Sequence, residues 1–144
     1  MITVERSFLV GVPLDDLIAY LEDFGHTEEW DPGTVRCVRI DGGPVRPGAS
    51  WHNTSRFRKR TTELLYRLEA REPHRLVFTG TNKTVTATDV MRFEAQSAAS
   101  TRMTYTASLR FKGLARLAEP FLRAEFEKLA DQVEQQLPPA AEAG

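Results

Sequence analysis

A carboxylate within an apolar strand face is the feature of this sequence that most suggests chemistry. Residues 84–96 (TVTATDVMRFEAQ) alternate with a period of two, which predicts a strand with Asp89 on an apolar face. The other members of that face are Val85, Ala87, Met91 and Phe93. Burial of an unpaired carboxylate costs several kcal/mol. Three arrangements are therefore open: a bulge that turns Asp89 outward, an inner Arg or Tyr that partners it, or a ligand group that meets it.

Two tyrosines are polar members of similar inward faces. Alternation places Tyr66 on the apolar face of residues 61–72 and Tyr105 on that of residues 101–111. A nucleophilic site is not indicated, because the chain has no G-x-S-x-G motif and Cys37 has no nearby His that could activate it.

The sequence predicts neither a metal site nor a cofactor. Its three histidines, His26, His52 and His74, are far apart and form no H-x-H or H-E-x-x-H pattern. One cysteine excludes an internal disulfide and a multi-Cys metal site. The segment DGGPVRPG lacks both the spacing of a phosphate-binding loop and a following helix.

Charge and hydropathy narrow the possible partners. The chain has 19 basic and 20 acidic residues, a formal charge of -1, so no overall field favours nucleic acid. Residues 56–60 (RFRKR) form a basic hairpin tip, which is ordinarily a solvated turn. No apolar run approaches about 18 residues and no secretory leader is recognisable, so we expect no membrane span and a cytoplasmic location.

The elements that position these residues follow from periodicity. Residues 2–10 are rich in β-branched side chains and predict a strand, and an apolar stripe from Leu14 to Leu21 predicts a helix after Pro13. A second short helix over residues 27–30 ends at Asp31-Pro32, because a residue before proline is pushed out of the helical region.

Six strands with short connections are then expected, an antiparallel meander. Their ranges are 34–40, 49–58, 61–72, 75–81, 84–96 and 101–111. A helical stripe from Leu114 to Leu137, which includes Phe121 and Phe126, closes the chain. Pro120 kinks this helix or splits off a short leading turn, and Pro138-Pro139 ends it, which leaves residues 140–144 as a flexible tail after a single domain over 1–139.

These segments resemble the START-like, or SRPBCC, superfamily over nearly the whole chain. The likeness rests on VPLDDLIAYLEDFGHTEEWDP, GGPVRPGASW, REPHRLVF and the terminal LRFKGLARLAEPFLRAEFEKLADQVEQQL. The resemblance implies an α+β helix-grip fold: a curved seven-stranded antiparallel sheet around a long C-terminal helix, with two short helices after the first strand. In the family pattern the Trp-x-Pro element, here Trp30 to Pro32, has a structural role.

The resemblance also implies an internal cavity for a small hydrophobic molecule, such as an aromatic or polyketide-like one, in a monomer or homodimer. The residues that we expect to line it are Trp51, Asn53, Ser55, Tyr66, Leu68, Phe78, Asp89, Met91, Tyr105, Phe121 and Phe126. Carriers and polyketide cyclases or aromatases both occur in the superfamily, and in a cyclase the catalytic candidates would be Asp89, Tyr66 and Tyr105, as donors or acceptors of a proton. Two alternatives stay open: the same faces also suit a filled core, and a co-chaperone-like interaction domain would have no true ligand.

Overall fold

The computed structural model describes all residues from Met1 to Gly144. Its elements are β1 (Ile2–Val10), α1 (Leu14–Leu21), η1 (Phe24–His26), α2 (Thr27–Trp30), β2 (Thr34–Arg39), β3 (Ser50–Phe57), β4 (Arg60–Glu72), β5 (Arg75–Thr81), β6 (Val85–Ser97), β7 (Ser100–Phe111), η2 (Gly113–Phe121) and α3 (Arg123–Ala143). The two η segments are 3₁₀-helices. The predicted order of a strand, a helical corner, six strands and a long terminal helix is confirmed.

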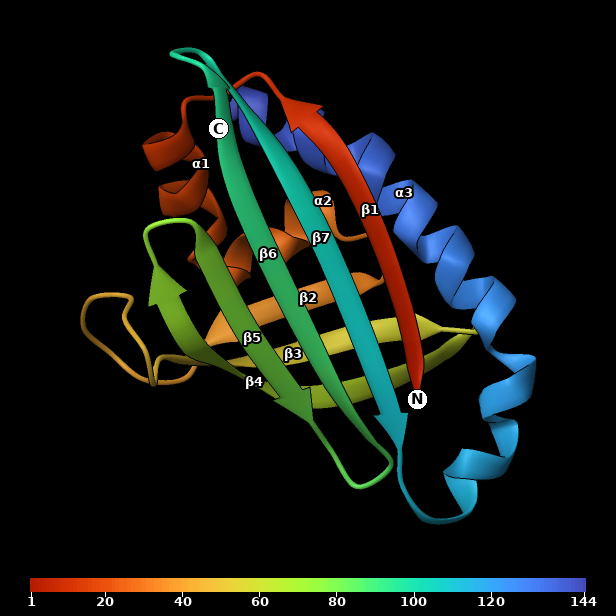
Figure 1. Cartoon of the computed structure of the whole chain (residues 1–144). Helices are drawn as coiled ribbons and strands as arrows, with labels where there is room; N and C mark the ends of the chain where they lie inside the picture. The colour runs from red at the N-terminus through yellow and green to blue at the C-terminus, as the bar shows by residue number, and fades with distance from the viewer.

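All seven strands form one antiparallel sheet in the order β1-β7-β6-β5-β4-β3-β2. Strands β2 to β7 each pair with their neighbour in sequence, and β1 pairs with β7, so the predicted meander is confirmed. Register shifts in β2, β4 and β6 bend these strands, because an unpaired residue increases the local twist. Figure 1 shows the resulting curved sheet with α3 beside β1, which is the helix-grip arrangement.

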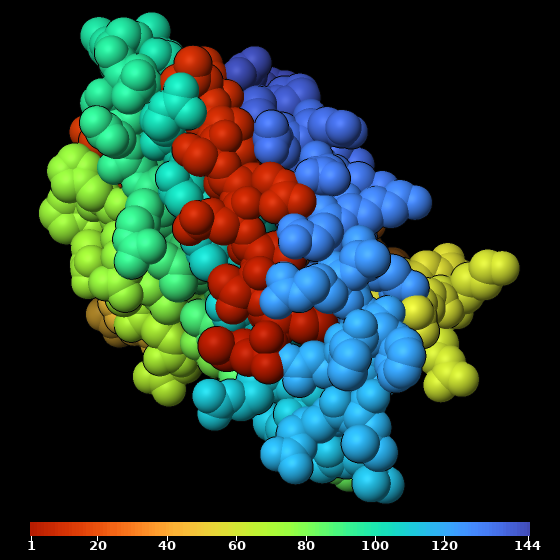
Figure 2. Space-filling model, turned by 45° about the vertical axis from the view of Figure 1, so that its right-hand side comes forward, coloured from red at the N-terminus to blue at the C-terminus, as the bar shows by residue number.

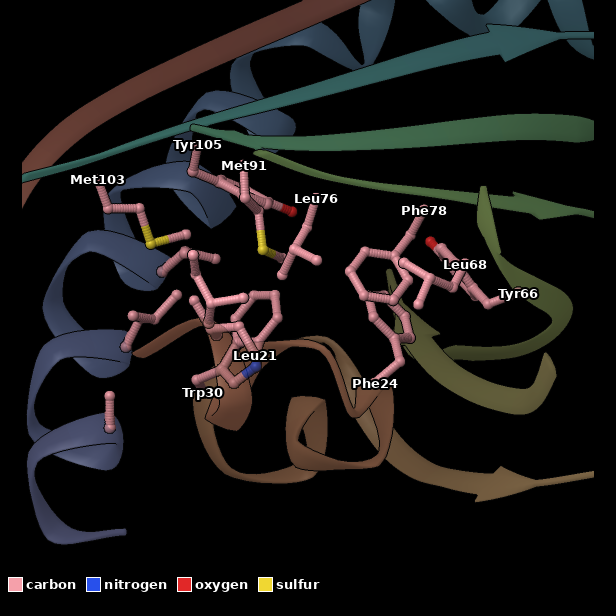
Figure 3. Packing of buried hydrophobic residues seen from close by; sticks show 14 of the residues in the cluster. Leu21, Phe24, Trp30, Tyr66, Leu68, Leu76, Phe78, Met91, Met103 and Tyr105 are labelled. Carbon is pink, nitrogen blue, oxygen red and sulfur yellow. The ribbon is translucent and has the colours of Figure 1, made fainter. Parts of the chain in front are cut away.

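Large side chains fill the part of the molecule nearest the helical corner, which consists of α1, η1 and α2. Trp51, Phe78 and Met91 are fully buried there in one hydrophobic cluster. Figure 3 shows Phe24 and Trp30 of the corner facing the side chains of the strands. The Trp30 ring packs edge-on against Phe24 and Tyr105, with centroids 6.4 Å and 5.9 Å away. The predicted structural role of Trp30 is therefore confirmed.

The end of α3 differs from the prediction. Pro138-Pro139 does not end the helix, which runs on to Ala143. Each proline removes one backbone hydrogen bond, but tertiary contacts hold the last turn: Leu137 and Ala141 are buried, and the Glu142 carboxylate accepts from the Gly11 N–H at 2.8 Å. The expected tail is thus helical. Although α3 has 21 residues, neither it nor any other helix is long and apolar enough to cross a membrane.

The segment before α3 also differs. Pro120 falls in a separate leading turn, one of the two expected outcomes, but that turn is the 3₁₀-helix η2 and its apolar side chains are not buried. Leu114, Leu117 and Phe121 are 85%, 73% and 75% exposed. In a 3₁₀-helix Leu114 and Leu117 share a face but Phe121 lies on another, so the single apolar stripe that an α-helix would present is not formed.

Candidate functional site

A pocket of about 600 Å³ lies between the inner face of the sheet and the first half of α3. Its walls come from β3, β4, β6 and β7, and the helical side adds Leu122, Phe126, Leu129, Ala130 and Val133. Of 27 lining residues 16 are hydrophobic, a size and composition typical of small-molecule sites. Figure 2 shows the β3–β4 hairpin, in yellow, projecting past α3 at this side of the molecule.

The pocket exists because inward-facing side chains become small toward one end of the strands. Asn53 and Ser55 follow Trp51 on β3, and Ala87 precedes Met91 on β6. On β7 the small residue is Ala107, which lies opposite Asp89 in the register. The same strand faces therefore build a packed core at one end and a hollow at the other.

Six of the predicted binding residues line this pocket. They are Asn53, Ser55, Tyr66, Asp89, Tyr105 and Phe126. The strand residues among them share the inner face that alternation assigned to them, and Phe126 reaches the pocket from α3. That these side chains bind a ligand stays a prediction.

The other five predicted binding residues do not line the pocket. Trp51, Leu68, Phe78 and Met91 are fully buried in the packed core and do not border the pocket. Alternation assigned their face correctly, but it carries no information on which end of a strand is filled. Phe121 is exposed on η2, because the α-helical period used to place it does not hold there.

The list of expected lining residues also omitted much of the apolar wall, although Val85 and Ala87 had been placed on the same strand face as Asp89. The missed residues include Leu64, Val85, Ala87, Ala107, Leu109, Phe111, Leu122, Leu129, Ala130 and Val133. A usable signal was present: Ala87 and Ala107 are the small residues on otherwise bulky inward faces of neighbouring strands, and small facing residues mark where a core leaves space.

Several polar side chains line the pocket. Asp89 and Tyr105 lie at its inner end, which is the end nearest the packed core. The Tyr105 hydroxyl donates to Oδ2 of Asp89 at 3.0 Å, so of the three arrangements open for Asp89 the tyrosine partner is the one found. Asp31 accepts from the Thr34 hydroxyl at 2.6 Å. The Ser55 hydroxyl donates to the side-chain oxygen of Asn53 at 2.5 Å.

Burial governs the acid–base properties of these groups. It raises the pKa of Asp89 to about 7, against a lowering effect of the Tyr105 hydrogen bond and a further increase from Asp31. Burial also raises the pKa of Asp31 and, with Asp89 nearby, the pKa values of Tyr66 and Tyr105. Near neutral pH the site therefore holds a carboxyl that can give or take a proton beside a phenol that stays protonated.

One glycine is required to place Tyr66. Gly80 is paired with Tyr66 across β4 and β5, and the aromatic ring lies over it. A Cβ at position 80 would be 2.4 Å from the Tyr66 ring, closer than any real contact. The absence of a side chain at Gly80 thus lets the phenol lie against the strand and form part of the pocket wall.

Two contacts between the β3–β4 hairpin and α3 cross the mouth of the pocket. The rings of Phe57 and Phe126 stack with centroids 4.8 Å apart. Beside them the Arg58 guanidinium pairs with the Glu125 carboxylate at 2.6 Å. No group of three or more His, Cys, Asp or Glu side chains is arranged to hold a metal ion.

The family model described as "Polyketide cyclase / dehydrase and lipid transport" matches residues 1–138. The chain belongs to this family. The START-like, SRPBCC-type resemblance seen in the sequence is thereby confirmed. No curated protein matches the chain.

Solved structures show the same fold. The Zhui aromatase/cyclase from Streptomyces sp. R1128 has a TM-score of 0.80 at 15% identity, over 97% of this chain and 93% of that one. A START superfamily protein from Mycobacterium smegmatis has a TM-score of 0.71 at 12% identity, over 92% and 94%. The chain also covers 46% of the di-domain ARO/CYC BexL from the BE-7585A biosynthetic pathway, at 14% identity and a TM-score of 0.67. At these identities the likeness establishes the fold and leaves the activity to the site.

Proposed function

We propose that this protein binds an apolar, aromatic or polyketide-like small molecule in the pocket between the sheet and α3. The observation that carries the proposal is a 600 Å³ hollow with mostly apolar walls and a buried Asp89–Tyr105 pair at its inner end. The single hydrogen bond from Tyr105 does not offset the burial of Asp89, since the pKa of this carboxyl is still raised, and a polar group of a ligand would supply a further partner.

The same pair supports cyclase or dehydratase chemistry on the bound molecule. A pocket that folds a chain of ketones brings its reacting carbons together, which alone contributes about 7–11 kcal/mol in intramolecular reactions. Asp89, with a pKa of about 7, would take a proton from an activated CH₂ group and return it to a leaving oxygen. Tyr105 would donate a hydrogen bond to a carbonyl or enolate. In a carrier the same groups would only orient the ligand.

Two substitutions separate the enzyme from the carrier. Asp89→Asn and Tyr105→Phe keep side-chain shape while removing the titrating carboxyl and the phenol hydroxyl. In an enzyme, cyclisation of a linear β-polyketone ester, followed by mass spectrometry, would fall by about 10²-fold or more while the affinity for the neutral dye N-phenylnaphthylamine is kept. In a carrier the wild type gives no product above background and the substitutions weaken dye binding only modestly. The binding proposal itself fails if the wild type binds no dye and no small molecule co-purifies with it in native mass spectrometry.

The interaction-domain alternative has one observation in its favour. Three apolar side chains of η2, those of Leu114, Leu117 and Phe121, are exposed, as on a docking surface. A collapsed interior would also favour that alternative, and the pocket beneath α3 is the opposite. Ligand binding therefore remains the function that the geometry supports best.

A further inference from the structure

Charge is distributed unevenly along the pocket. The acidic side chains in its lining are Asp31 and Asp89, and Asp31 lies near enough to Asp89 to raise the pKa of that carboxyl. The mouth has no acidic residue among its lining and three basic ones: Arg56, Arg58 and Arg60. Since the whole chain carries a formal charge of -1, this cluster is a local feature of the mouth and not part of a general basic surface.

The alternation of side chains along β3 and β4 determines which of these arginines can contact a molecule bound in the pocket. Arg60 lies on the same face of β4 as Leu64 and Tyr66, so its side chain extends from the pocket wall, and it has no ion-pair partner. Arg58 is in the turn and is held at the mouth by Glu125 of α3. Arg56 alternates with Ser55 and Phe57 and therefore points to the outer face of β3.

The turn that presents Arg58 has an unfavourable backbone. Strand β3 ends at Phe57 and β4 begins at Arg60, so Arg58 and Lys59 form a two-residue loop, and their φ angles are +53° and +64°. Such loops favour Asn-Gly, because other residues are strained by about 1 kcal/mol or more in the left-handed region. The sequence nevertheless has two cations there, which is the kind of local strain found at functional sites.

We propose that the ligand of this pocket carries an anionic group, such as a carboxylate, which lies at the mouth against Arg60 and Arg58 while the apolar body extends inward. The inference rests on the proposed function and adds the charge and the orientation of the ligand. A guanidinium suits this task, because its planar N–H groups match the oxygens of a carboxylate, sulfonate or phosphate. At present Glu125 competes with such a group for Arg58.

A matched pair of fluorescent probes tests the proposal. Dansylamino-undecanoate and its neutral primary amide differ only in charge at the end of the chain. For wild type at low salt we expect the carboxylate to bind about tenfold more tightly than the amide, and the ratio to shrink in high salt. Arg60→Gln should remove most of that ratio. Glu125→Gln, which frees Arg58, should increase it about twofold or more.

Arg92→Gln is the control, since it removes the same charge from an exposed site on β6 that does not border the pocket. It should leave both affinities unchanged. Equal affinities of wild type for the two probes, or a ratio that responds to Arg60→Gln no more than to Arg92→Gln, would overturn the inference while the binding proposal stands. If wild type binds neither probe, the binding proposal fails together with it.

Discussion

Asp89 and Tyr105 meet because of the register between β6 and β7. Asp89 lies opposite Ala107, and Tyr105 is therefore its diagonal neighbour on the same face, within reach of a hydrogen bond. Alanine at position 107 leaves the space beside the carboxyl open to the pocket. The residues that surround Asp89 thus both bury it and leave it accessible to a small molecule.

The raised pKa of Asp89 predicts a stability that falls as the pH rises. In the unfolded chain the carboxyl has its usual pKa of 3.8, and in the fold the value is about 7. Below about pH 4 both states hold the proton; between about pH 4 and pH 7 the unfolded state loses it first, so the unfolding free energy decreases. Above about pH 7 the loss is complete, and it amounts to at most about 4 kcal/mol. Asp31, whose pKa is also raised, acts in the same direction.

The variant Asp89→Asn should lack the part of this pH dependence of the unfolding free energy that comes from the Asp89 carboxyl. Urea unfolding of the variant and of wild type at several pH values would give two curves that diverge, with the variant gaining stability relative to wild type from about pH 4 to pH 8. Parallel curves would show that the carboxyl is not desolvated in the fold.

At the level of elements, the strands, α1 and α2 were predicted well, whereas η2 and the end of α3 were not. The ranges 2–10 and 75–81 match β1 and β5 in full, because alternation and turn residues are local signals. The helix α3 continues past Pro138, and a contact with the distant residue Gly11 holds its end through Glu142; no local sequence pattern contains such a contact. The 3₁₀ conformation of η2 changed the period from the one that the apolar spacing suggested, and so Phe121 was misplaced.

The last turn of α3 gives a test at this scale. Ala141 is buried against the main core, whereas Ala143, two residues on, is exposed. Ala141→Glu should therefore lower the unfolding free energy by about 2 kcal/mol or more, because it buries a charge without a partner. Ala143→Glu adds the same charge to the same turn and should change it by less than about 0.5 kcal/mol. If thermal unfolding shows that both variants lower the unfolding free energy equally, the last turn does not pack against the core and residues 140–144 form a flexible tail, as predicted from the two prolines.

On the scale of the whole molecule, the pocket is a property of several strands at once. The sequence predicted that Asn53, Tyr66 and Asp89 face inward, since facing depends on alternation within one strand. It did not predict that Trp51 and Met91 fill one end while the other end is hollow, since that depends on which residues of different strands meet. A comparison of the sizes of inward residues on paired strands would have located the hollow, because Ala87 and Ala107 are diagonal neighbours on β6 and β7.

The central claim is that this hollow binds an apolar molecule, and filling it is the most direct test. Ala107→Trp places an indole in the pocket, and Thr88→Trp, on the outer face of the adjacent strand, adds the same bulk elsewhere. Fluorescence titration with N-phenylnaphthylamine should show binding to wild type and to Thr88→Trp, and a loss of affinity of about tenfold or more in Ala107→Trp when circular dichroism shows both variants folded. Unchanged affinity in a folded Ala107→Trp protein would contradict the account.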